Sequence, residues 1–80
     1  MHLEIISPEK IIYKDKNGEV DSVTLPGVVG SFTILNNHAP IVSVLKNGII
    51  TYKIGEDEEK IEINSGFVEA KQNVVSVCVE

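Results

Sequence analysis

The sequence contains no arginine and no tryptophan, only one cysteine, and no apolar run longer than a few residues. Without arginine, the chain lacks the side chain that proteins favour for reading DNA bases and for holding phosphate groups through two parallel hydrogen bonds. The single cysteine, Cys78, cannot form an internal disulfide, which suits a reducing compartment. The apolar runs are too short for a transmembrane helix. Residues 1–4 include no basic segment and no long apolar segment, so the N-terminus predicts no secretory signal.

The charge of the chain is acidic. Its 80 residues include seven lysines and twelve aspartates and glutamates, which gives a net charge of −5 at pH 7. A nucleic-acid-binding protein normally presents a basic face, so we predict that nucleic acid is not a partner. The length and the 42% of hydrophobic residues predict one globular domain over residues 1–80, with a small core.

Valine, isoleucine and threonine dominate short runs that are separated by turn residues, and this pattern is typical of β-strands. No segment repeats its apolar residues with a helical period, so we expect almost no helix. The turns recur every eight to ten residues or so, which predicts an all-β fold, an antiparallel β-sandwich of about ten short strands. The predicted strands cover residues 2–6, 10–14, 19–25, 32–35, 41–45, 49–54, 59–63, 67–71 and 74–79.

Asn-Gly pairs mark two of the predicted turns. Asn17 and Gly18 lie between two predicted strands, and such a pair tolerates the positive φ angles that a tight hairpin turn requires. Asn47 and Gly48 repeat the signal. We therefore expect a hairpin at residues 15–18, with positive φ at both of its central residues.

Two predicted strands, residues 41–45 and 74–79, are apolar on both faces. Strands of this kind lie in the middle of a layered core or beneath a partner, and in so small a domain part of this surface is expected to face another subunit. The loop at residues 26–30 is also apolar, with Val28 and Val29 at its tip and Phe32 beyond it. Two interpretations remain open for this loop: it folds back over the core, or it contacts a protein partner.

Side chains that could carry chemistry are few. His38 and Cys78 are the one familiar pair of base and nucleophile, but Cys78 lies among valines, where an inert buried thiol is the usual case. The acidic run at residues 56–59 lacks the spacing of a calcium loop and reads as a solvated hairpin tip. The glycines at residues 27–30 precede no helix that could hold a phosphate. We predict no catalytic residue, no metal and no cofactor.

A series of segments, in the order and spacing in which they occur, resembles the N-terminal β-sandwich of the epsilon subunit of F-type ATP synthases. The resemblance covers essentially all 80 residues. Its strongest element is the sequence His-Ala-Pro at residues 38–40, and the other segments are residues 3–9, 25–27, Gly30, 32–35, 65–69 and 73–77.

The resemblance implies a non-catalytic subunit in the rotating central stalk that joins the gamma subunit to the membrane ring. It is not an obligate homo-oligomer, and the complex places it at the cytoplasmic face of the bacterial inner membrane. Many family members continue into a two-helix hairpin, which carries nucleotide binding and inhibition of ATP hydrolysis. The present sequence ends at its last predicted strand, so it resembles a short form without that hairpin, and we carry neither property over.

The resemblance also implies two contact surfaces. One lies against gamma and comprises His38, Ala39, Pro40 and Ser43. The other approaches the ring and comprises Gly30, Ser31 and Phe32. An alternative interpretation is a lipoyl-type carrier, with Lys16 displayed on a turn for covalent modification, or a stand-alone β binding module.

Overall fold

A computed structural model describes all 80 residues of the chain, and it contains no helix. The fold therefore has no helix that could cross a membrane. The prediction of an all-β sandwich is confirmed, with nine strands where about ten were expected. They are β1 (His2–Ile6), β2 (Ile11–Lys14), β3 (Ser22–Pro26), β4 (Ser31–Leu35), β5 (Ile41–Leu45), β6 (Gly48–Ile54), β7 (Asp57–Ile63), β8 (Gly66–Lys71) and β9 (Val74–Val79).

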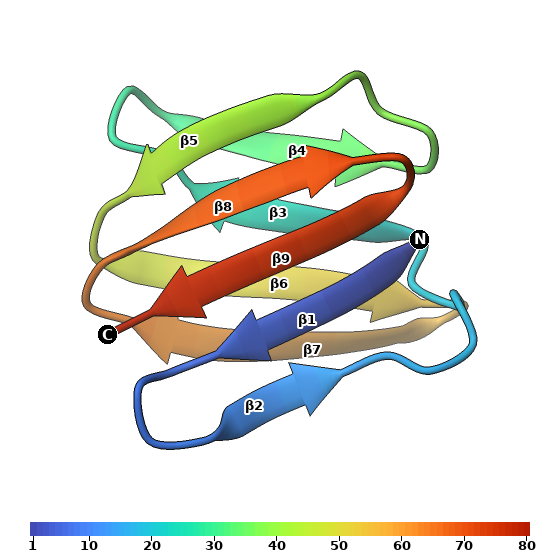
Figure 1. Cartoon of the computed structure of the whole chain (residues 1–80), viewed down its shortest axis with the longest axis horizontal. Helices are drawn as coiled ribbons and strands as arrows, with labels where there is room; N and C mark the ends of the chain where they lie inside the picture. The colour runs from blue at the N-terminus through green and yellow to red at the C-terminus, as the bar shows by residue number, and fades with distance from the viewer.

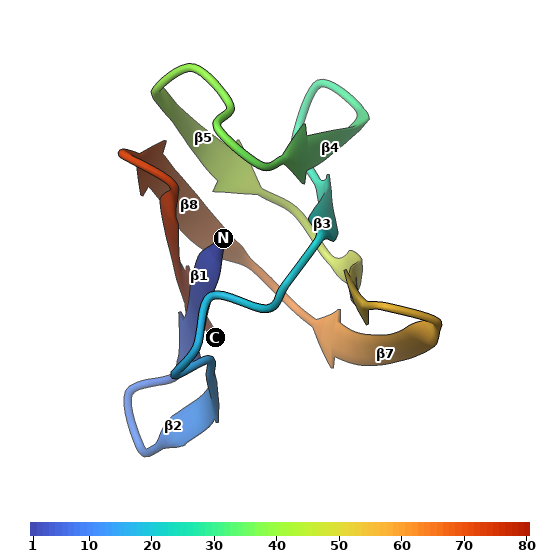
Figure 2. The same ribbon diagram turned by 90° about the vertical axis from the view of Figure 1, so that its right-hand side faces the viewer.

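The strands form two sheets that face each other. One sheet has five strands in the order β2-β1-β9-β8-β5, and it lies in front in Figure 1. The other has four strands in the order β4-β3-β6-β7. Figure 2 shows that β4 and β5 lie at one open edge of the sandwich, with β2 and β7 toward the opposite edge. Each sheet thus ends in two edge strands, and these edges position the sites described below.

The core is entirely apolar. Alternate residues of each strand point inward, so that in β9 the side chains of Val75, Val77 and Val79 are buried while those between them face outward. No polar or charged residue is buried. The buried hydrophobic residues are Met1, Leu3, Ile5, Val20, Val23, Leu25, Ile34, Leu45, Ile50, Tyr52, Ile63, Val68, Ala70, Val75, Val77 and Val79.

One pair of neighbouring strands is parallel, which the sequence pattern did not predict. β1 lies beside β9 and runs in the same direction, with His2 opposite Val74 and Ile6 opposite Cys78. Every other pair of neighbouring strands is antiparallel. A parallel pair cannot be joined by a tight turn, and here nearly the whole chain separates its two strands. The first and last strands therefore hold the five-stranded sheet together at its centre.

The predicted hairpin at residues 15–18 is wrong. β2 pairs with β1 and β3 pairs with β4 and β6, so this segment crosses from one sheet to the other. Gly18 has a φ of 72°, but Asn17 has no positive φ. The Asp15 carboxylate accepts a hydrogen bond from the Gly18 amide at 2.6 Å and closes a local turn. The segment between β5 and β6, which contains Asn47, likewise crosses between the sheets.

The turn with two positive φ angles lies instead between β8 and β9. Gln72 and Asn73 have φ values of 51° and 61°, and Lys71 pairs with Val74 on either side of them. Two central residues with positive φ are the mark of the turn whose twist matches the twist of a hairpin. The Asn73 side chain also accepts a hydrogen bond from the Asn37 amide at 2.8 Å. This turn therefore connects the last hairpin to the β4–β5 loop.

Replacing Gly18 with valine is expected to lower the free energy of unfolding by about 1–2 kcal/mol, since a β-branched residue is strained at positive φ. A Cβ atom at this position would also lie 3.2 Å from the His2 imidazole. Gly18→Asn is the matched control, because asparagine adopts positive φ angles more readily than valine does. It should lower the free energy of unfolding by less than the valine substitution. Urea denaturation followed by circular dichroism measures both changes. Equal midpoints for the valine variant and the unaltered protein would contradict the expectation.

Candidate functional site

The predicted gamma-contact residues His38, Ala39 and Pro40 are exposed in the connection from β4 to β5. A turn places them there: the His38 amide donates to the Leu35 carbonyl at 3.2 Å, and Asn37 has a φ of 60°. His38 Nδ1 lies 2.6 Å from the Ala39 carbonyl oxygen. The loop thus presents these three residues to solvent in a defined conformation.

Two side-chain contacts hold this loop to the rest of the sandwich. One is the hydrogen bond from the Asn37 amide to Asn73 in the β8–β9 turn. The other joins the chain's N-terminal amino group to Asn36 Oδ1 at 2.6 Å. The same amino group donates to the Val20 carbonyl at 2.8 Å. The loop is therefore tied to parts of the chain that are far from it in sequence, which stiffens it.

Ser43, the fourth predicted gamma-contact residue, lies in the edge strand β5 opposite Val68. Its side chain is half-buried on the core side of the strand, and its hydroxyl lies 3.4 Å from the Val44 carbonyl. The outward-facing residues of β5 are its neighbours, Val42 and Val44, and both are exposed. Because adjacent residues of a strand face opposite sides, Ser43 and this pair cannot share one face.

The predicted ring-contact residues lie at the other end of β4 from His38. Gly30 and Ser31 are exposed, whereas Phe32 is half-buried and packs against the core. A Cβ atom at Gly27 would lie only 2.9 Å from the Phe32 ring, so the loop backbone rests directly on this side chain. Phe32 therefore supports the loop from below, and the surface at this end is formed by other residues.

The exposure of its tip excludes one of the two interpretations of the valine loop, and contact with a protein partner stays a prediction. Val28 is 53% exposed and Val29 is fully exposed, so neither folds back over the core. The Val28 amide donates to the Val44 carbonyl at 3.1 Å, and the Lys46 amide donates to the Pro26 carbonyl at 2.9 Å. These hydrogen bonds hold the loop against the end of β5 while its apolar tip faces solvent.

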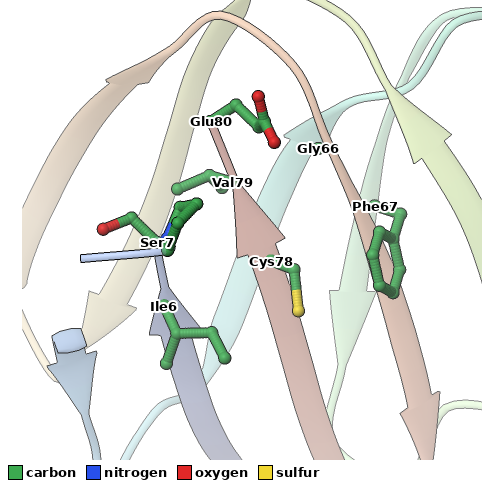
Figure 3. A pocket seen from close by; sticks show the side chains of 8 residues that line it. Ile6, Ser7, Gly66, Phe67, Cys78, Val79 and Glu80 are labelled. Atoms are coloured by element: carbon green, nitrogen blue, oxygen red, sulfur yellow. The ribbon is translucent and has the colours of Figure 1, made fainter. Parts of the chain in front are cut away.

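An apolar row crosses the outer face of the five-stranded sheet. Val44, Phe67, Cys78 and Ile6 are successive register partners on β5, β8, β9 and β1, and we call them the outer apolar row. Val44 is 60% exposed and Phe67 is 51% exposed, although both are large apolar side chains. Figure 3 shows Phe67, Cys78 and Ile6 around a hollow of about 260 Å³ that extends to Glu80. A polar sheet face would be expected here in the absence of a partner.

The sequence indicated this row only in part. The two-sided apolar pattern of residues 74–79 and 41–45 predicted an exposed apolar surface, but Phe67 and Ile6 were not singled out. The alternation of β8 does indicate Phe67, because Val68 and Ala70 face the core and Phe67, next to Val68, must face outward. Only the register of four strands brings these side chains into one row.

The structure does not bring His38 and Cys78 together. His38 belongs to the loop beside Asn73, at the start of β9, and Cys78 lies near the other end of that strand. Cys78 is half-buried within the outer apolar row. Lys16, the residue of the carrier alternative, is exposed in the crossing segment between the two sheets and not at the tip of a hairpin.

The chain's two tyrosines lie against each other at the opposite edge of the sandwich. The ring centroids of Tyr13 on β2 and Tyr52 on β6 are 4.5 Å apart, with the planes inclined by 32°. Burial raises the pKa of both phenols above the ordinary value of 10.0. The negative charge of Asp15 adds to the rise in pKa at Tyr13, and that of Glu59 adds to it at Tyr52.

A spectrophotometric titration of phenolate is expected to show both tyrosines ionising above pH 10.0 in the folded protein. Because the folded state favours the neutral phenol, their contribution to stability is fully present below the unfolded pKa and decreases as pH rises through the raised pKa. In denaturant both should titrate at the ordinary value. Tyr13→Phe leaves one transition, from Tyr52. A folded-state titration identical to the denatured one would contradict the expectation.

The two facing sheets define a small β-sandwich domain that displays apolar side chains on one outer face and on one loop tip. The family model described as ATP synthase, Delta/Epsilon chain, beta-sandwich domain matches residues 1–80, the whole of the chain. The chain therefore belongs to this family of delta/epsilon chain domains of ATP synthase.

Curated relatives agree with this assignment. The ATP synthase epsilon chain of Leptospira borgpetersenii serovar Hardjo-bovis (strain JB197) is 45% identical over 80 residues, which are 100% of this chain and 61% of the relative. The epsilon chain of Rhodopseudomonas palustris (strain BisA53) is 38% identical over 79 residues, which are 99% of this chain and 56% of the relative. The chain thus spans about three fifths of the length of these relatives.

Solved structures share the fold. A chain of the Euglena gracilis mitochondrial ATP synthase has a TM-score of 0.88 at 23% identity, over 96% of this chain and 48% of that one. A chain of the Tetrahymena thermophila mitochondrial ATP synthase, in a structure of its central stalk and c-ring, has a TM-score of 0.81 at 18% identity. That match covers 99% of this chain and 62% of the other. The fold is thus shared at low sequence identity.

Proposed function

We propose that this chain is the β-sandwich domain of a non-catalytic central-stalk subunit in an F-type ATP synthase that translocates protons or sodium ions. It couples the gamma subunit to the membrane ring during ATP synthesis and is held at the cytoplasmic face of the bacterial inner membrane by these partners. The observation that carries the proposal is the outer apolar row, which starts at Val44 near the end of β5 that is remote from the β4–β5 loop, in a chain of the delta/epsilon family.

The contact with gamma is assigned to the β5 side of the molecule. It comprises the predicted residues His38, Ala39 and Pro40 in the β4–β5 loop and Ser43 on the core side of the edge strand β5. It extends around this edge to Val42 on the outer face and to the outer apolar row at the far end of β5. Exposed apolar side chains in adjacent strands are typical of the centre of a protein interface, and a polar rim surrounds such a centre. Glu69 and Lys71 on β8 are exposed and would contribute to that rim.

The contact with the ring is assigned to the loop between β3 and β4. Gly30 and Ser31 are its predicted surface residues, Val28 and Val29 add apolar area, and Phe32 supports the loop from the core. The ends of β4 are separated by about 13 Å, at about 3.3 Å per residue. The β4–β5 loop and the ring-contact loop would therefore lie at different ends of one strand, whereas the outer apolar row reaches the ring-contact end, where the Val28 amide donates to the Val44 carbonyl. Ser31 supplies no charge to this contact.

A coupling part must resist shear between its two partners. The chain has 46 backbone hydrogen bonds, 35 of them within its strands, and one apolar core between the two sheets. Close-packed interiors have low compressibility and transmit strain. The sandwich therefore has the mechanical properties that a rotor element needs.

The experiment is reconstitution of an epsilon-depleted ATP synthase from the same source with the purified chain. We expect the chain to co-purify with the gamma subunit and the ring, and to restore ion pumping driven by ATP hydrolysis in membrane vesicles. Hydrolysis by the detached catalytic head should change little, because the chain is not catalytic. Failure to bind either partner, or a lipoyl mass on Lys16 in protein from its own host, would contradict the proposal.

A further inference from the structure

The edge of the sandwich opposite the β4–β5 loop contains a cleft that the proposed function does not use. Its lining residues come from β2, β6 and β7, and β2 and β7, edge strands of the two sheets, diverge at this edge of the molecule (Figure 2). Its volume is about 230 Å³. The residues that line it are Tyr13, Tyr52, Ile54, Asp57 and Glu59. It therefore combines two aromatic rings with two carboxylates.

The carboxylates lie on the side of β7 that faces the core. Glu59 is the register partner of the buried Tyr52, and Asp57 is the partner of Ile54, so each pair shares a face of the sheet. Further along the same face, β7 has Ile61 packed against the core. Asp57 and Glu59 are nevertheless exposed, so at this end of β7 the inward-facing side is open to the cleft and is not covered by the core.

Neither carboxylate is neutralised within the chain. Their neighbour Glu58, on the outer face of β7, lies 3.8 Å from the Lys53 ammonium and 3.9 Å from the Lys60 ammonium. No lysine, histidine or amino terminus lies within 4.0 Å of Asp57 or Glu59. The two lysines that are near in sequence are thus directed to the outer face, and the cleft keeps an uncompensated negative charge.

Tyr52 adds a second, independent sign of a missing ligand. Its residue is only 6% exposed, yet its hydroxyl makes no hydrogen bond within the chain and is not sealed from the cleft. The hydroxyl is therefore free to accept a hydrogen bond from a group in the cleft. The Tyr13 and Tyr52 rings, which pack against each other at an inclination of 32°, form an aromatic wall of the cleft.

The cleft suits a cationic side chain of another polypeptide better than a metal ion or a small molecule. No three side chains of the metal-binding types converge anywhere in the chain, so the carboxylates do not form a metal site. The volume is below the roughly 300 Å³ at which small-molecule sites begin. The cleft also lies between two edge strands, whose free backbone groups favour contact with another polypeptide.

We propose that this cleft binds a lysine or arginine side chain from a basic segment of a protein partner. The ammonium or guanidinium group lies between the carboxylates of Asp57 and Glu59 and donates a hydrogen bond to the Tyr52 hydroxyl, while the aliphatic part of the side chain lies beside the tyrosines. This is a third contact surface, at the edge opposite the one assigned to gamma.

The test is a titration of the ¹⁵N-labelled 80-residue protein, followed by NMR, with a blocked tripeptide that has arginine at its centre. We expect saturable shifts in the millimolar range that are confined to the ends of β2, β6 and β7. Replacing the arginine with citrulline, a neutral isostere, should abolish them. The guanidinium ion alone should bind more weakly than the tripeptide, because it lacks the backbone.

Variants of β7 supply a matched pair. Glu59→Gln should weaken binding of the arginine tripeptide by about fivefold, whereas Glu58→Gln, one residue away on the other face, should change it less than twofold. Tyr52→Phe should weaken it without loss of the folded spectrum. Equal weakening by the two glutamine variants, equal binding of citrulline, or a guanidinium ion that binds as tightly as the tripeptide would overturn the proposal. The titration involves neither gamma nor the ring, so its result is independent of the proposed function.

Discussion

Val44→Asp is expected to weaken binding of the chain to the gamma subunit about a hundredfold while leaving the fold intact. Val44 is 60% exposed and lies at one end of the outer apolar row. A carboxylate buried in an apolar interface without a partner loses its hydration, and a hundredfold corresponds to about 2.8 kcal/mol. Isothermal titration calorimetry with purified gamma from the same source measures the change in affinity.

The matched control for this substitution is Ile49→Asp. Ile49 is also β-branched and 50% exposed, but it lies on the outer face of the four-stranded sheet, opposite Glu62. Both variants add one negative charge, so a general electrostatic effect would weaken them equally. We expect the Ile49 variant to bind gamma within about threefold of the unaltered chain. Equal affinities for the Val44 variant and the unaltered chain would remove the outer apolar row from the proposed interface.

Ile5→Ala is expected to lower the free energy of unfolding by about 3 kcal/mol. Ile5 is fully buried in β1, between β2 and β9, and its removal leaves a cavity that the close-packed sheets cannot fill. The free energy of unfolding of a domain of this size is only about 4–12 kcal/mol, so the loss caused by Ile5→Ala is a large share of it. Thermal denaturation should show a Tm lower by about 12–24 °C, at about 4–8 °C per kcal/mol.

Ile11→Ala controls for the side-chain change itself. Ile11 is 59% exposed in β2, and its truncation removes little buried surface. Its unfolding free energy should stay within about 0.5 kcal/mol of the unaltered protein. Similar losses for the two variants would mean that β1 does not hold the centre of the five-stranded sheet.

Local sequence signals predicted the strands well, because each strand is specified by neighbours in the chain. The alternation in residues 74–79 reappears in the structure, where Val75, Val77 and Val79 are buried. The two residues left between the predicted strands 67–71 and 74–79, Gln72 and Asn73, form the turn of the last hairpin. The resemblance of the His-Ala-Pro segment at residues 38–40 and its companion segments led to the family that the comparisons show.

The sites were less predictable, because they depend on which strands become neighbours. The resemblance pointed to Phe32 as a surface residue, but the close approach of Gly27 places its ring beneath the loop. The acidic run at residues 56–59 is exposed at the β6–β7 hairpin, as expected of a solvated tip, but the sequence does not separate its two faces. In the fold, Glu58 faces two lysines on the outer side, while Asp57 and Glu59 line the cleft with the tyrosines.

The sequence by itself determined the strand composition, the acidic charge and the family of this chain, since these follow from the identity and order of the residues and do not depend on which strands pair. Tertiary structure decided which strands pair, including the parallel pair of β1 and β9 and the crossings at Asn17 and Asn47. An Asn-Gly pair favours a turn but does not say whether the next strand returns to the same sheet. That choice depends on burying the apolar faces of both sheets at once, a property of the whole chain.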